Sequence, residues 1–260
     1  MPVIHFLGRI VPASAKHISL SYPTPTDKLQ SKYVSPENDL EAALTFRIAN
    51  SQVDVECELN RFDDSPDFLG ILHKPVYDLT HALVSIVDFS TGYGLMLYFD
   101  YLIKPDGQRS PLLMQHPNLA ALCTSFRLTD PLEFWRVLQI VLSDSSLCMA
   151  FNDLNESITL THHATHSCAR CIERLRNSMC GASMDRKHAW IQFGDNLRES
   201  KTYMDFITDR AAGSRHGDPT FIPGPEVKEV LERSWTIINR FLEYRKRGNT
   251  TLPLSEFPLL

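Results

Sequence analysis

Residues Arg198–Pro219 read RESKTYMDFITDRAAGSRHGDP, and the second half of the chain is arranged around this stretch. Its long helical pattern breaks at Gly213, and a second amphipathic pattern follows over Pro225–Lys246. On that last helix apolar residues recur every three or four positions, so Trp235 and Phe241 are expected to be buried. The stretch therefore places charged, hydrogen-bonding side chains at a junction between two helices.

Three further helices are predicted before this junction. The first begins at Thr129-Asp130-Pro131, where a capping side chain precedes a proline suited to the first helical turn. The second is expected over Ser157–Cys180, and the third from about Ser183 to Ala212. Four helices with mostly short connections predict an antiparallel helical bundle over residues 130–248, followed by an irregular tail over 249–260.

The first part of the chain follows the period of a β-strand. Within Gln52–Arg61 the apolar residues alternate strictly with polar ones, which is typical of a half-buried strand. Leu40–Ala49 precedes it and is separated from it by Asn50-Ser51, so the two segments are expected to form a β-hairpin. Residues 12–39 are rich in proline, serine and threonine and are predicted to be a loop-like excursion.

Other elements complete this N-terminal region. Val3–Val11 is β-rich, and Leu95–Lys104 is predicted to be a strand. Between them, an amphipathic helix is expected to start at Pro66, and Pro75 should kink or split it. Residues 1–125 are therefore predicted to form an α+β domain, with an antiparallel sheet and one covering helix.

Length and charge are compatible with two domains of ordinary size. The chain has 260 residues, 43% of them apolar, and a net charge of −5, so no general affinity for nucleic acid follows from it. The charge is uneven, because residues 168–247 hold 15 basic and 11 acidic residues. This asymmetry indicates either an anionic partner for the C-terminal part or simply a solvated face.

The sequence also bears on the compartment. The start, MPVIHFLGRIVP, has no basic segment ahead of a long apolar run, so it does not resemble a signal peptide. No window approaches the roughly 18 consecutive apolar residues that a membrane span needs. Six cysteines in a chain of this size are not a dense disulfide framework. We expect a cytoplasmic protein with reduced thiols and no membrane association.

One cluster combines residue types that bind metals. His162–Cys171 contains three histidines and the pair Cys168 and Cys171, and thiolates and imidazoles suit Zn²⁺. His163 or His166 could join the two thiolates at one metal. However, structural zinc sites usually take their pairs from turns, and the sequence has no second matching pair. The alternative is a helix that happens to carry these residues, and we expect no metal and no cofactor.

Arg210 and His216 are the strongest candidates for chemistry. A histidine near neutral pKa can accept and return a proton, and a guanidinium can hold the charge of a phosphate. Cleavage of RNA by its own 2′-hydroxyl needs a group that transfers protons and a group that holds the phosphate charge, but no metal. A structural alternative also exists, in which Gly213 ends the helix in the left-handed conformation and Arg210 satisfies the last helical carbonyls.

An arginine, five intervening residues and a histidine in a C-terminal four-helix bundle resemble the Arg-x(4–6)-His motif of HEPN domains. HEPN domains are helical bundles found in toxin, CRISPR-associated and abortive-infection ribonucleases, and many dimerise so that two motifs form one site. The resemblance covers roughly residues 130–248. Active members commonly carry a polar residue directly after the arginine, whereas this chain has Ala211.

The resemblance implies two alternative functions. In the first, the protein is an RNA-directed effector of toxin or phage-defence type, a metal-independent endoribonuclease. Arg210 would then anchor the phosphate, His216 would act as acid and base, and Arg215 would contact the substrate. In the second, it is a non-enzymatic interaction or RNA-binding module with a degenerate HEPN-like site. Both alternatives imply a homodimer formed through the helical bundle, with RNA as the expected partner in the first.

Overall fold

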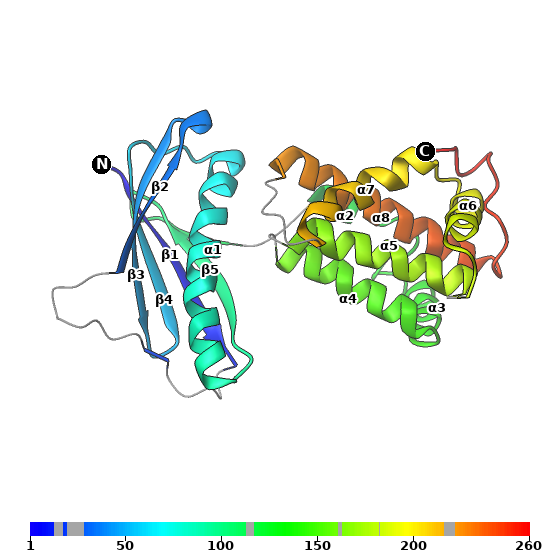
Figure 1. Cartoon of the computed structure of the whole chain (residues 1–260), viewed down its shortest axis with the longest axis horizontal. Coiled ribbons are helices and arrows are strands. Elements are labelled where there is room, and N and C mark those ends of the chain that lie inside the picture. The colour runs from blue at the N-terminus through cyan, green and yellow to red at the C-terminus, as the bar shows by residue number, and fades with distance from the viewer. Residues whose placement is uncertain (13–17, 20–28, 113–116, 161–162, 182, 216–221) are drawn as a thin grey trace. The chain divides into compact units, whose positions relative to one another are not determined.

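A computed structural model describes residues 1–12, 18–19, 29–112, 117–160, 163–181, 183–215 and 222–260. The chain divides into two compact units, Met1–Leu113 and Met114–Leu260. The first contains a sheet and a long helix, and the second is built of helices (Figure 1). The α+β class is therefore confirmed, while the division falls earlier than the expected boundary between residues 125 and 130. No helix in the described ranges is long and apolar enough to cross a membrane.

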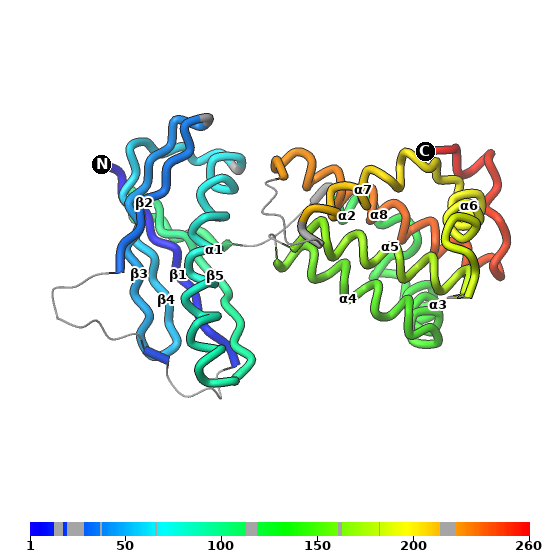
Figure 2. Tube along the Cα trace, viewed as in Figure 1, coloured from blue at the N-terminus to red at the C-terminus, as the bar shows by residue number. Residues whose placement is uncertain are grey.

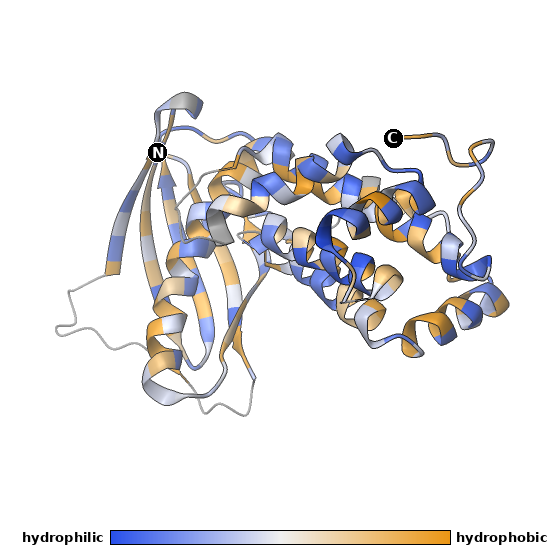
Figure 3. Ribbon diagram, turned by 45° about the vertical axis from the view of Figure 1, so that its right-hand side comes forward, coloured by the Kyte–Doolittle hydropathy of each residue, from blue (hydrophilic) through white to orange (hydrophobic). Residues whose placement is uncertain are grey.

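The N-terminal unit is a six-stranded antiparallel sheet covered on one face by a helix. The strands are β1 (Val3–Val11), β2 (Leu29–Ser35), β3 (Leu40–Ala49), β4 (Gln52–Leu59), β5 (Met96–Ile103) and β6 (Arg109–Pro111), in the spatial order β2-β3-β4-β1-β5-β6. Hydrophobic and hydrophilic residues alternate along the strands (Figure 3). One set of side chains, including Phe6 and Val55, is buried on the same side as Leu72 and Val76 of helix α1 (Pro66–Thr91).

The predicted hairpin is confirmed, because β3 and β4 pair from Ala42 and Leu59 to Ala49 and Gln52. Asn50 and Ser51 connect them with φ angles of 51° and 61°. Two consecutive residues with positive φ form the type of turn whose twist matches that of the flanking strands. The local sequence therefore determines both the turn and the register of this pair.

One expectation for this unit was wrong, and one of the two outcomes expected at Pro75 is excluded. Leu29–Ser35 lies within the predicted loop, yet it forms the edge strand β2, because the free edge of β3 supplies its hydrogen-bond partners. The rest of the proline-rich stretch lies largely outside the described residues. Helix α1 is also continuous through Pro75 and is not split. Burial of Leu72 and Val76 on either side of this proline keeps both halves of the helix on the sheet.

The C-terminal unit has more helices than the four expected. Its described part contains α2 (Pro117–Leu122), α3 (Pro131–Leu142), α4 (Ser145–Thr159), α5 (Ala164–Cys180), α6 (Arg186–Leu197), α7 (Lys201–Arg215) and α8 (Gly224–Lys246). Helix α5 is rich in buried residues, and with Phe193 of α6 and Phe241 of α8 it contributes to one continuous core. The predicted helix over Ser157–Cys180 is therefore the end of α4 followed by α5.

The predicted helix from Ser183 to Ala212 is likewise two helices, α6 and α7. The chain reverses at Arg198, whose φ angle of 61° is left-handed, and the amide of Glu199 donates to the carbonyl of Gly194 at 2.9 Å. A β-carbon on Gly194 would lie only 2.6 Å from the Glu199 carbonyl oxygen. Gly194 therefore permits the close approach of the two segments that this reversal requires.

The irregular tail, residues 249–260, packs on the helices and can be followed past α6 in Figure 2. Leu252 is fully buried, and its amide donates to the Asn196 carbonyl at 3.0 Å. Arg198 Nε donates to the Leu252 carbonyl at 2.7 Å, and the buried Arg240 donates to the Pro258 carbonyl at 2.9 Å. The tail is therefore part of the folded unit, although it forms no regular element.

Candidate functional site

Helix α7 carries Arg210 at the edge of its buried face. Met204, Ile207 and Ala211 recur at spacings of three and four residues and lie in the core of the helical unit. Arg210 lies next to this stripe, and 31% of its side chain is exposed. The sequence therefore positions an arginine whose aliphatic stem packs on the protein while its guanidinium reaches solvent.

The guanidinium of Arg210 is held by one residue from each of two helices. Its Nε donates to Oε2 of Glu226, in the first turn of α8, at 2.9 Å. Its Cζ lies 3.7 Å from the ring centroid of Phe206, one helical turn earlier on α7. In the described part of the chain Nε is its one donor engaged in a hydrogen bond, which leaves the two terminal amino groups available to an anion.

A second arginine lies beside the same aromatic ring. The Cζ of Arg233, on α8, lies 4.1 Å from the Phe206 centroid and 4.6 Å from that of Tyr203. Its Nε donates to Glu229 at 3.0 Å, and its Nη1 donates to the Tyr203 carbonyl at 3.2 Å. Two guanidinium groups therefore lie beside Phe206, each paired with a carboxylate, and the formal charges of these four groups balance.

The structure does not test the association of the three predicted site residues. Helix α7 continues through Gly213, where the sequence predicted a break, and ends at Arg215, whose side chain is not among those described. His216 lies in the segment 216–221, outside the described residues. Arg210 is thus the one predicted residue whose side chain the structure places, and the described structure neither joins it to His216 nor separates them.

The packing of α7 explains why an alanine occupies position 211, where active HEPN domains commonly carry a polar residue. Ala211 is fully buried and belongs to the core of the helical unit. A polar side chain at this position would be buried unless α7 turned about its axis, and an unsatisfied buried polar group is costly. The alanine therefore fits the packing of α7 in this chain.

In the turn that precedes α7, a buried carboxyl group lies against a buried arginine. Oε1 of Glu199 lies 3.3 Å from Nε of Arg240, and both residues are buried. Arg240 also donates to the carbonyls of Leu197 and Arg198 at 3.0 and 2.7 Å. Burial raises the pKa of Glu199 to about 8, although the charge of Arg240 opposes the shift. The pair fixes the start of α7 to α8.

The two cysteines of the candidate metal cluster are core residues of α5. Cys168 and Cys171 are fully buried, and burial raises the pKa of Cys168 to about 11 and that of Cys171 as well. His163 is exposed, and His162 lies outside the described residues. The described residues contain no group of three His, Cys, Asp or Glu side chains that could hold a metal ion. The cysteines therefore pack as small apolar residues in this helix.

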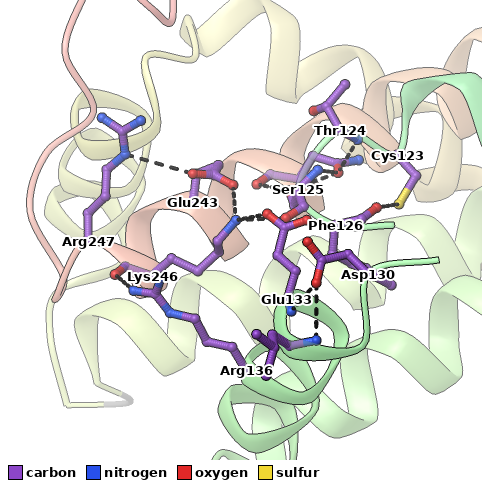
Figure 4. Close-up of polar contacts among 12 residues, drawn as sticks. Cys123, Thr124, Ser125, Phe126, Asp130, Glu133, Arg136, Glu243, Lys246 and Arg247 are labelled. Carbon is purple, nitrogen blue, oxygen red and sulfur yellow. Dashed lines mark hydrogen bonds and ion pairs between the residues drawn. The ribbon is translucent and has the colours of Figure 1, made fainter. Parts of the chain in front are cut away.

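A further polar cluster at the other end of α8 is structural (Figure 4). Nζ of Lys246 donates to the Ser125 carbonyl and to Glu243, both at 2.7 Å, and lies 3.4 Å from Oε1 of Glu133. The side-chain oxygen of Asn239 accepts from the amide of Ser125 at 3.1 Å. These contacts tie α3 and the loop before it to α8.

Sequence reasoning missed Phe206, Glu226 and Arg233. Phe206 had a local signal, because it lies four residues before Arg210 on one helix and such residues are neighbours on the surface. Glu226 and Arg233 had none, because their contacts join two helices whose relative rotation is fixed by core packing.

Comparison with protein families identifies both halves of the chain. Residues 4–113 match the family model described as "Domain of unknown function (DUF8168) N-terminal domain". Residues 134–246 match the one described as "Domain of unknown function (DUF8168) C-terminal domain". The chain belongs to the DUF8168 family.

The two DUF8168 domains correspond to the two units of the structure. The N-terminal match covers the sheet and α1, and the C-terminal match extends from α3 to the end of α8 and includes Arg210 and Glu226. No curated protein and no solved structure matches the chain. The functional argument for this DUF8168 protein therefore depends on its own residues.

Proposed function

We propose that the protein is a cytoplasmic RNA-directed effector of the HEPN-like kind, which cleaves RNA without a metal at the connection between α7 and α8. The observation that supports this most is the state of Arg210. Its guanidinium is stacked on Phe206 and oriented by Glu226, while its terminal amino groups are available in the described structure. An arginine held in this way loses little freedom when it binds a phosphate.

In the proposed reaction Arg210 binds the non-bridging oxygens of the scissile phosphate, and Arg215 contacts the RNA substrate. His216 removes the proton of the 2′-hydroxyl, whose oxygen then attacks the phosphorus. The bond from phosphorus to the 5′-oxygen breaks, and that oxygen receives a proton from an imidazolium, supplied by the same histidine or by its copy in a dimer. The products are a 2′,3′-cyclic phosphate and a 5′-hydroxyl.

The test is a cleavage assay on unstructured RNA, with the product ends identified by mass spectrometry. The wild-type protein should produce cyclic phosphate ends in the presence of EDTA, and Arg210→Ala should abolish them without a change in its melting temperature. Arg186→Ala is a matched control, because Arg186 is an exposed arginine of the same unit that lies on α6. Cleavage that requires a metal, or that survives in Arg210→Ala, would reject the proposal.

A second candidate function is that of a non-enzymatic module that pairs with a second copy of itself. Helix α3 is apolar nearly all round, yet Val137 is its one buried residue. Leu132, Trp135 and Leu142 follow one stripe and are 83%, 59% and 69% exposed. A helix with this composition is normally covered. The stripe contains no charged residue, so two copies related by a two-fold axis meet without like-charge repulsion.

Sedimentation measurements distinguish this second candidate. A dimer of the wild-type protein that becomes a monomer in Trp135→Glu, together with an absence of RNA cleavage and binding in both proteins, would favour the interaction module. A monomeric wild-type protein at micromolar concentration would reject it.

A further inference from the structure

The face of the N-terminal sheet opposite α1 carries a shallow hollow of about 440 Å³. Side chains from neighbouring strands line it, among them Arg9, Arg47, Asp54, Asp100, Tyr101 and Arg109. On β1 the buried residues Ile4, Phe6 and Ile10 alternate with residues of this open face, and Arg9 is one of the latter. The hollow therefore lies on the side of the sheet that the helix does not cover.

The carboxylates of the hollow already have basic side chains as partners. Asp100 lies 3.2 Å from Nη2 of Arg9, and Asp54 lies 3.4 Å from Nη1 of Arg47 and 2.9 Å from Nδ1 of His5. Nη2 of Arg47 also contacts Glu56, at 3.0 Å. Repulsion of an anion by these carboxylates is thus reduced, and the arginines keep further donors for a ligand.

Arg109 differs from the other two arginines of the hollow. Its Cζ lies 3.6 Å from the centroid of the Tyr101 ring, across the pairing of β5 and β6. Among the described residues no carboxylate lies within ion-pair distance of Arg109. Stacking on tyrosine orients the guanidinium and leaves its donors unused, which is the arrangement that binds a phosphate with little loss of freedom.

An irregularity in the sheet brings a second aromatic ring to the same face. The register of β1 and β5 shifts between Leu7 and Gly8, and a β-carbon on Gly8 would lie 2.3 Å from the Tyr98 carbonyl oxygen. Because of this shift Tyr98 and Tyr101, three residues apart, are opposite Arg9 and Leu7 on the open face. The two tyrosines are 40% and 37% exposed, so their rings are accessible.

We propose that this open face binds a segment of single-stranded nucleic acid, with a phosphate on Arg109 and Arg9 and a base on Tyr98. Exposed aromatic rings bind any nucleobase by stacking, and arginines beside them neutralise the backbone. An acidic peptide would use the arginines but would leave the two tyrosine rings without a planar partner. The proposal involves a different unit from the Arg210 site and does not depend on cleavage.

The test is a fluorescence-anisotropy titration of a labelled, unstructured RNA of about 12 nucleotides, a length within the usual range for such surfaces. The 260-residue protein carries His216→Ala so that the RNA stays intact. In this background Arg109→Gln should weaken binding about tenfold and reduce the dependence on salt, because one phosphate contact is lost. Tyr98→Leu should weaken binding to a similar extent, because one stacking contact is lost.

Lys32→Gln is the matched control. Lys32 pairs with Glu41 at 2.7 Å on the same open face, but it lies on β2, outside the hollow. This variant removes the same charge and should bind within about twofold of the parent. Equal weakening in Arg109→Gln and Lys32→Gln would mean a non-specific charge effect and would overturn the proposal, as would an absence of binding in the parent protein.

Two competition measurements identify the class of ligand. Single-stranded DNA of the same sequence should compete with the RNA, because the contacts involve base and phosphate alone. Free uridine monophosphate should compete only weakly, and equal competition per nucleotide would reject a strand in favour of a free nucleotide. If the protein cleaves RNA, Arg109→Gln should raise KM and leave kcat unchanged. A loss of kcat would contradict a binding role.

Discussion

Arg210 of α7 and Glu226 of α8 form an ion pair with an Nε–Oε2 distance of 2.9 Å, at the junction that the sequence marks as the candidate site. Both side chains are partly exposed, so solvent screens the pair and its contribution to folding is small. Its effect on a ligand is larger, because Glu226 holds the guanidinium in place and also places a negative charge where a phosphate would approach.

Glu226→Gln should therefore increase the affinity for RNA. The amide still accepts the hydrogen bond from Arg210, but the negative charge is gone, and we expect a gain of about two- to tenfold. Glu229→Gln is the control, because Glu229 pairs with Arg233 one helical turn later. Anisotropy titration measures both variants. A weaker affinity in Glu226→Gln would mean that its charge is needed to position Arg210.

The buried carboxyl of Glu199 predicts a pH dependence of stability. In the unfolded chain it releases its proton near 4.5, whereas the folded protein retains the proton up to about pH 8. The folded state binds more protons in this window, so the free energy of unfolding should fall as the pH rises through it and level off above it. In Glu199→Gln this fall should be largely lost.

Urea unfolding followed by tryptophan fluorescence measures this dependence in the C-terminal unit, because Trp135, Trp190 and Trp235 all belong to it. An unchanged pH profile in Glu199→Gln would show that Glu199 is ionised in the folded protein and that its pair with Arg240 outweighs its burial.

The last helix provides a graded test of core packing. Phe241 is fully buried, so Phe241→Ala should cost about 3–5 kcal/mol. Trp235 was expected to be equally buried, but it is only partly buried at the margin of the core, and Trp235→Ala should cost about 1–2 kcal/mol. Urea unfolding, with the remaining tryptophans as reporters, gives both values. A larger loss in Trp235→Ala would indicate that an unseen partner covers this residue.

Lys246 should stabilise the junction of α3 and α8. Lys246→Met keeps most of the side-chain volume but leaves the Ser125 carbonyl and Glu243 without their donor, at a cost of about 1–3 kcal/mol. Lys201→Met removes an exposed lysine paired with Asp205 and should change stability by less than about 0.5 kcal/mol. Equal melting temperatures of the two variants would contradict a structural role for Lys246.

Periodicity predicted the elements whose partners are close in sequence. The alternation in β4 and the Asn50-Ser51 turn determined the hairpin, and the stripe on α8 determined its buried face. Strand β2 could not be predicted in this way, because its hydrogen bonds depend on the free edge of β3. Burial of Leu72 and Val76 also accounts for the continuity of α1 through Pro75.

The candidate site was likewise predictable only where its contacts are local in the sequence. Arg210 was identified from a local spacing, and Phe206 could have been identified from its own spacing to Arg210 on the same helix. Glu226 and Arg233 depend on how α8 is rotated against α7, and this rotation is set by core residues such as Ile207 and Val230. The hollow of the N-terminal sheet was not foreseen either, because Arg9, Arg47 and Arg109 lie far apart in the sequence and meet only through strand order.

The most direct test of the proposed function is the single-turnover rate of RNA cleavage in EDTA, measured for the wild-type protein and for His216→Ala. Removal of a general acid and base should lower this rate by about 10²–10⁴-fold, with unchanged RNA affinity and melting temperature. The wild-type protein should yield 2′,3′-cyclic phosphate ends. Equal rates in the two proteins, or no cleavage of any RNA by the wild-type protein, would contradict the assignment of a ribonuclease site to the α7–α8 junction.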